Sequence, residues 1–163
     1  MRFKGNLALW SEECQDLLRA VPAARGQPSA STVASMADAE YPCPCCGHVI
    51  FHEPPGSYDI CGICFWEDDI VMLRWATIGG GANHASLVEA QRNYAEFGAG
   101  ERAHLVHVRP ATDDEPVEDG WRPIDLERDS FEPEGAQEAP WPEDSTVLYW
   151  WRPTFWRRDR SPA

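Results

Sequence analysis

Four of the six cysteines form two Cys-x-x-Cys pairs, and 14 residues separate one pair from the other. The pairs are Cys43 with Cys46 and Cys61 with Cys64. A turn of this kind directs both sulfurs to one side, and four thiolates at ~2.3 Å satisfy the tetrahedral preference of Zn²⁺. Four sulfur ligands leave no open position for water or substrate. The spacing therefore predicts one structural zinc ion per chain, with a single iron as the alternative metal.

Cys45 is a surplus thiol inside the first pair. It could replace a neighbouring ligand, or it could be activated by the metal and act in redox signalling. We favour an inert thiol, because a lone extra Cys within such a metal-binding turn is more often inert.

Two elements must position the cysteines. Residues 48–51 and 57–60 read as the strands of a hairpin that joins the two pairs, with Glu53-Pro54-Pro55-Gly56 as its turn. Further along, Ser86 and Glu89 have the spacing of a capping box, which opens a helix that we expect to run to Phe97 and to end at Gly98. The expected fold class is α+β, with a small zinc-ribbon-like β-hairpin module, one capped helix and a loop-rich C-terminal extension.

Composition divides the chain into three parts. Residues 1–39 combine a short helix, ended by Pro22, with a flexible linker rich in Ala, Ser, Pro and Gly. Residues 40–112 form the cysteine-containing domain. Residues 113–163 form an acidic, Trp-rich extension that we expect to pack on this domain, and residues 146–151 within it read as a strand.

Three motifs together resemble one known family. They are YPCPCCG at residues 41–47, C-x-x-CFWEDD at residues 61–69, and GGAN-x-x-SL-x-EA-x-x-NY-x-x-FG at residues 80–98. These residues resemble the bacterial cysteine-rich CPCC domain family, and the resemblance covers roughly residues 40 to 115. It implies a small zinc-binding domain of unknown biochemical role. It brings no catalytic residue to carry over.

The formal net charge of −13 limits the classes of partner. A nucleic acid requires a positive face, and 27 acidic against 14 basic residues leave little to build one. No apolar run approaches the ~20 residues that span a bilayer, so we expect no membrane association. Without a secretory signal, we expect a cytoplasmic protein with reduced thiols. The acidity indicates either a cationic partner or solubility alone.

Acidic residues follow the second cysteine pair directly. Glu67, Asp68 and Asp69 could hold a second cation or serve in acid–base chemistry. We favour a solvated acidic loop with Trp66 packed on the metal site, because nothing in the sequence fixes a nucleophile beside these carboxylates.

Trp150, Trp151, Arg152 and Trp156 are the candidates for an interaction surface. Trp and Arg dominate binding hot spots, because they bury large areas and still form hydrogen bonds. The alternative is that this segment packs on the metal module while its arginines pair with the acidic residues.

The sequence therefore predicts a zinc-binding, non-enzymatic protein-interaction module. Its acidic face would neutralise a basic protein, as an immunity protein does. The alternative is a metal-dependent enzyme that uses Glu67, Asp68 and Asp69 with a histidine around a second ion. A nucleic-acid module ranks third, since charge opposes it.

Overall fold

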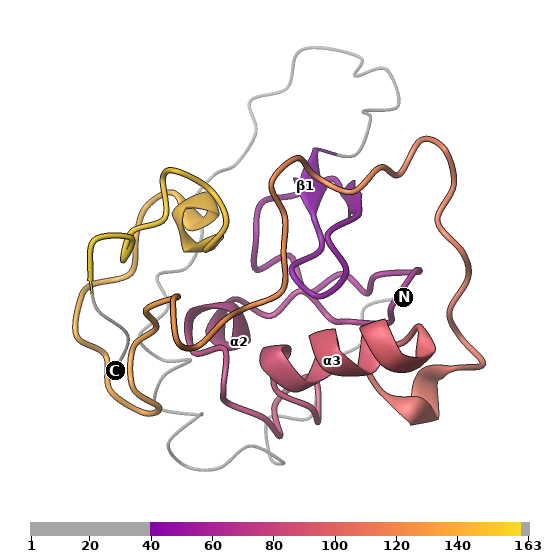
Figure 1. Cartoon of the computed structure of the whole chain (residues 1–163), viewed down its shortest axis with the longest axis horizontal. Helices are drawn as coiled ribbons and strands as arrows, with labels where there is room; N and C mark the ends of the chain where they lie inside the picture. Colours follow the sequence, from indigo (N-terminus) through magenta and orange to yellow (C-terminus); the bar gives the residue numbers. More distant parts are fainter. Residues whose placement is uncertain (1–39, 161–163) are drawn as a thin grey trace, which may run out of the picture.

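The computed structural model describes residues 40–160, and Figure 1 shows their arrangement. The elements are β1 (Tyr41–Pro42), β2 (Val49–Phe51), α2 (Ile70–Arg74), α3 (Leu87–Phe97) and the 3₁₀ turns η2 (Arg102–His104) and η3 (Ser145–Leu148). A two-strand antiparallel sheet with two α-helices is compatible with the predicted α+β class. The helix and linker predicted for residues 1–39 lie outside the described residues.

The sheet encloses the first cysteine pair. Tyr41 faces Phe51 and Pro42 faces Val49 in antiparallel register, with an irregularity between Tyr41 and Pro42. The predicted strand at residues 48–51 thus agrees with β2, but its predicted partner is wrong, since β2 pairs with β1 and not with residues 57–60.

Residues 57–60 form no strand, so the hairpin predicted between the two cysteine pairs is absent from the described chain. Ile60 makes a single bridge to Glu67, which closes the loop around the second pair. The left-handed backbone of Tyr58, at φ 61°, interrupts the extended conformation that a returning strand needs. Each cysteine pair therefore has its own closed loop.

Helix α3 follows its sequence signals. The Ser86 side chain accepts from the Glu89 N–H, and the Glu89 carboxylate accepts from the Ser86 N–H, so both halves of the capping box form. Gly98 ends the helix in the left-handed conformation. Leu87 and Ala90 direct the buried face into the core.

Helix α2 was not predicted. Asp69 caps it by accepting from the backbone N–H groups of Val71 and Met72. Its last four residues, 71–74, are all buried. A short helix that is enclosed on all sides shows no 3.6-residue apolar period, so the pattern that reveals a surface helix was missing.

The prediction of a strand at residues 146–151 is wrong. This segment forms η3 and successive turns, which Figure 1 shows in yellow. The Asp144 side chain accepts from the Thr146 N–H, and Tyr149 donates its N–H to the Thr146 carbonyl. These local hydrogen bonds outweigh the β propensity of the aromatic residues.

The C-terminal segment shares one core with the cysteine domain. The Tyr149 hydroxyl donates to the Pro42 carbonyl at 3.0 Å. Gln91 joins both parts, because its amide donates to the Pro44 carbonyl and accepts from the Ile124 N–H. None of the helices within residues 40–160 has the length and apolar character needed to cross a lipid bilayer.

Candidate metal centre

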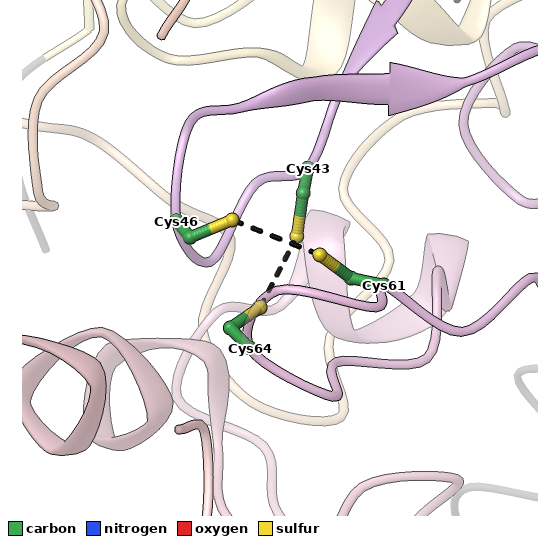
Figure 2. Close-up of side chains that lie close together, drawn as sticks. All are labelled: Cys43, Cys46, Cys61 and Cys64. Atoms are coloured by element: carbon green, nitrogen blue, oxygen red, sulfur yellow. Dashed lines mark hydrogen bonds between the residues drawn. The ribbon is translucent and has the colours of Figure 1, made fainter. Parts of the chain in front are cut away.

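The four paired cysteines converge on one point, as Figure 2 shows. Their sulfur atoms all lie within 4.8 Å of one another, and no side chain is more than 1% exposed. Cys43 Sγ lies 3.6 Å from Cys64 Sγ, and Cys46 Sγ lies 3.8 Å from Cys61 Sγ. Four sulfurs placed ~2.3 Å from a central ion in a tetrahedron would lie ~3.8 Å apart. The cluster therefore has the donors and the size to hold a metal ion.

The two cysteine loops have the same hydrogen-bond pattern. Cys43 donates its N–H to the His48 carbonyl, and Cys61 donates to the Trp66 carbonyl, at 2.9 and 2.8 Å. In each loop the residue after the second cysteine donates its backbone N–H to the carbonyl of the first cysteine at 2.8 Å. Gly47 does so in the first loop and Phe65 in the second. These bonds set the direction of the sulfurs without any help from a continuous hairpin.

Burial controls the ionisation of the cluster. It raises the pKa of Cys43 and of Cys64 well above the usual range. Hydrogen bonds from Cys43 and the other thiols lower the pKa of Cys61, since they stabilise its thiolate. A closed pocket of this kind disfavours four negative charges unless a cation neutralises them. The donor chemistry thus fits a divalent metal.

Arg109 lies beside the second pair and was not singled out from the sequence. Its backbone N–H donates to the Gly62 carbonyl at 3.1 Å. A Cβ built at Gly62 would lie 3.5 Å from the Arg109 Nε. Its guanidinium donates to the Glu115 carboxylate at 2.7 Å, so this pair adds little net charge beside the thiolates. The glycine within Cys61-Gly62-Ile63-Cys64 was the available signal, because it leaves room for a neighbour.

Cys45 is fully buried and is not one of the four convergent cysteines. A Cβ at Gly100 would lie 3.9 Å from its sulfur, so the thiol packs against that loop. Burial raises the pKa of Cys45. A buried, protonated thiol is a poor nucleophile, which favours the inert interpretation.

Two of the three acidic residues after the second pair are not solvated, which corrects the expectation for this loop. Asp68 and Asp69 are 1% and 0% exposed, and Trp66 is buried beside them. Asp68 Oδ2 accepts from the N–H groups of Gly56 and Ser57 and from the Ser57 hydroxyl.

These carboxylates have structural roles. Asp69 caps α2, and burial raises its pKa to about 6. Burial also raises the pKa of Asp68 and of the half-buried Glu67. Within residues 40–160, the four cysteines are the only group of three or more His, Cys, Asp or Glu side chains placed to hold a metal ion.

The predicted interaction residues are largely engaged inside the protein. Trp150 is 4% exposed and donates to the Arg122 carbonyl, so its side chain is not available to a partner. Trp151 and Arg152 both donate to the Glu118 carboxylate. Trp156 packs against the Arg74 guanidinium at 4.7 Å. This arrangement is the packing alternative stated above.

The central part of the chain matches a protein-family model. The family model described as Cysteine-rich CPCC matches residues 41–115, a range that includes all four convergent cysteines and α3. No curated protein matches the chain.

Proposed function

Since residues 41–115 form a cysteine-rich CPCC domain, we propose that the protein binds one structural zinc ion that shapes a non-enzymatic protein-interaction module. The observation that carries this proposal is the buried cluster of four sulfurs within 4.8 Å. Thiolates are soft ligands that select zinc over magnesium or calcium, and four of them complete a tetrahedron.

The metal would contribute much of the stability of the domain. A two-strand sheet is marginal by itself, and most of the described chain consists of loops. Structural zinc supplies an apparent ~10–16 kcal/mol in finger-sized peptides.

The five described cysteines form no disulfide, which fits a reducing compartment, and we place the protein in the cytoplasm.

Metal counting tests the centre. We expect elemental analysis and native mass spectrometry of the full chain to give one zinc ion, and Cys43→Ser or Cys61→Ser to lose it. Cys45→Ser is the matched control and should retain it, because Cys45 lies outside the four-cysteine group. A protein that purifies without metal, or whose zinc content ignores the Cys61→Ser change, would contradict the proposal.

The closed ligand set supports a non-enzymatic role. Catalytic zinc usually has three protein ligands and an open position, whereas this cluster offers four sulfurs. Asp68 and Asp69, two carboxylates of the rival enzyme hypothesis, each use one oxygen to accept from backbone N–H groups. The rival requires a second ion, so two metals per chain in the same analysis would favour it.

Surface charge supports a cationic partner. Of the 13 acidic residues from Asp113 to Asp144, five form ion pairs with arginines: Glu115, Glu118, Asp129, Glu132 and Glu138. The other eight are exposed and have no ion pair within residues 40–160: Asp113, Asp114, Asp119, Asp125, Glu127, Glu134, Glu143 and Asp144. We infer that these unpaired carboxylates attract a basic protein, as an immunity protein attracts its toxin.

Affinity capture from cells of the source organism, at low salt, tests the partner. We expect the native chain to retain a basic protein that salt releases, because exposed charges are screened at high ionic strength. A variant with Asp113, Asp114, Asp119 and Glu127 changed to their amides should retain less of it. If the two proteins capture the same material, or neither captures a basic protein, the charge argument fails.

A further inference from the structure

Residues 116–118 extend the sheet beyond β2. An antiparallel bridge joins Val117 to His48, and in Figure 1 this orange segment passes beside the two strands. Two backbone hydrogen bonds of 2.9 Å flank the bridge, from the Val49 N–H to the Pro116 carbonyl and from the Glu118 N–H to the Gly47 carbonyl. β2 therefore lies between β1 and an outer strand. We propose that this outer strand pairs with an extended, basic segment of a partner protein.

The backbone of Val117 points away from the sheet. In an antiparallel pair, a residue between two such hydrogen bonds directs its own N–H and C=O to the opposite side. His48 shows this on the other strand, since its carbonyl accepts from the Cys43 N–H. Neither the N–H nor the carbonyl of Val117 has a hydrogen-bond partner within residues 40–160, and Val117 is 45% exposed. This donor and this acceptor are therefore available to another strand.

The chain around this edge is strongly acidic. Five of the seven residues 113–119 are acidic, and ion pairs with Arg109 and Arg152 neutralise two of the five. The other three are exposed and form no ion pair within the described chain: Asp113, Asp114 and Asp119. A strand that carries Lys or Arg would bring opposite charges to these carboxylates.

Charge also disfavours two other occupants of the edge. A second copy of the chain would bring carboxylates of the same segment against one another, which destabilises a strand pair. Residues 1–39 contain four basic and four acidic side chains, so they bring no net positive charge. A proline and repelling charges are the features by which sheet edges avoid pairing with themselves, and Pro116 lies in this strand. The edge thus resists its own copy and suits a basic strand.

The inference rests on the basic partner of the proposed function, and it adds the surface and the backbone geometry that would bind that partner. A synthetic peptide tests the edge directly. Its result does not depend on capture of a protein from cells.

Titration of the full-length, metal-loaded protein with the blocked peptide Lys-Val-Lys-Val-Lys-Val-Lys tests the edge by calorimetry and by amide hydrogen exchange. The alternating pattern gives a strand one basic face. We expect saturable binding, and the Val117 N–H should exchange more slowly in the complex. The same peptide with every amide nitrogen methylated keeps the charge but cannot pair as a strand. It should bind at least about tenfold more weakly.

Val117→Pro removes the outward N–H without breaking a hydrogen bond within residues 40–160, and Val117→Ala is the matched control that keeps this N–H. The proline variant should bind the peptide about tenfold more weakly, and the alanine variant should stay within about twofold of the native protein. Metal content and urea denaturation check that both variants fold. Changing Asp113, Asp114 and Asp119 together to Asn should weaken binding and reduce its dependence on salt.

An absence of peptide binding would overturn the proposal, even if affinity capture recovers a basic protein, since the acidic surface would then act without the edge. Equal binding of the methylated peptide, or equal affinities of the proline and alanine variants, would show that strand pairing plays no part. A Val117 N–H that is already protected in the free protein would also contradict it. Protection that depends on protein concentration would identify a second copy as the occupant, and protection independent of concentration would identify residues 1–39.

Discussion

Gly47 and Phe65 occupy equivalent positions in the two cysteine loops, and both have a left-handed backbone, with φ of 80° and 65°. Glycine adopts this conformation freely, whereas phenylalanine does so at a cost. The Phe65 ring contacts His104 and His107, with centroids 4.4 and 5.1 Å away. These contacts offset the strain, and they let two loops of different sequence present their sulfurs in the same way.

A side chain at Gly47 should destabilise the protein strongly. A Cβ there would lie 2.4 Å from Trp121 Cδ2, closer than any real contact, in addition to the left-handed backbone. We expect Gly47→Ala to lower the free energy of unfolding by about 2–4 kcal/mol, measured by urea denaturation. Gly120→Ala is the control, since its φ is 81° but nothing lies within 4 Å. That change should cost about 1 kcal/mol. Equal losses would mean that Trp121 does not pack on Gly47.

Removal of the metal should unfold the cysteine domain. Without a cation, the buried thiols cannot all ionise, and the two loops lose the ion that joins them. We expect a strong chelator at neutral pH to lower the melting temperature and to abolish the near-ultraviolet circular dichroism of buried residues such as Trp66 and Trp75. Chelator already saturated with zinc should have no effect. A metal-free protein that melts like the loaded protein would refute a structural role for the ion.

Local signals predicted the convergence of the four cysteines and helix α3 correctly. The cysteine spacing encodes a turn within each pair, and the capping box of Ser86 and Glu89 encodes a helix start within four residues. Both depend on neighbours along the chain. This is why their positions were predictable from the sequence.

The features that failed depend on distant partners. The partner of β2 is β1, which lies across the first cysteine loop, and no local pattern distinguishes it from residues 57–60. Asp68 and Asp69 look like surface residues by type, yet they are buried because backbone N–H groups of residues 56–57 and 71–72 need acceptors. Those needs become visible only in the folded structure.

The burial of Asp69 should make stability depend on pH. Its pKa rises from the ordinary 3.8 to about 6, mainly because burial disfavours the charged form. The folded state therefore binds this proton more tightly than the unfolded state. The stabilisation is fully present below about pH 4 and is lost as the pH rises through about 6.

Asp69→Asn tests this dependence, because an amide keeps the oxygen that caps α2 but cannot ionise. We expect the variant to be more stable than the native protein at pH 8, by on the order of 3 kcal/mol, and this advantage to shrink as the pH falls. Urea denaturation at a series of pH values, down to the lowest at which both proteins keep their metal, measures the difference. A difference that does not change with pH would show that Asp69 is ionised throughout.

A buried ion pair joins α2 to the acidic segment. Arg74 Nε donates to Glu132 Oε2 at 2.6 Å and Nη2 donates to Oε1 at 2.9 Å, and both side chains are 0% exposed. Trp75, Trp141 and Trp156 surround the guanidinium within 4.9 Å. Removing one partner would leave an uncompensated charge in the core. We expect Glu132→Gln to lower the free energy of unfolding by about 3–5 kcal/mol.

The matched control is Glu96→Gln, which breaks the pair between Arg102 and Glu96, whose side chains are 68% and 67% exposed. Water and salt already screen that pair, so the variant should unfold at the same urea concentration as the native protein. Because both substitutions remove one negative charge, the difference between them isolates the effect of burial. The Glu132 variant could be no less stable than the Glu96 variant only if Arg74 found another neutralising partner or reached solvent. That result would contradict the enclosed arrangement of Arg74 and the three tryptophans.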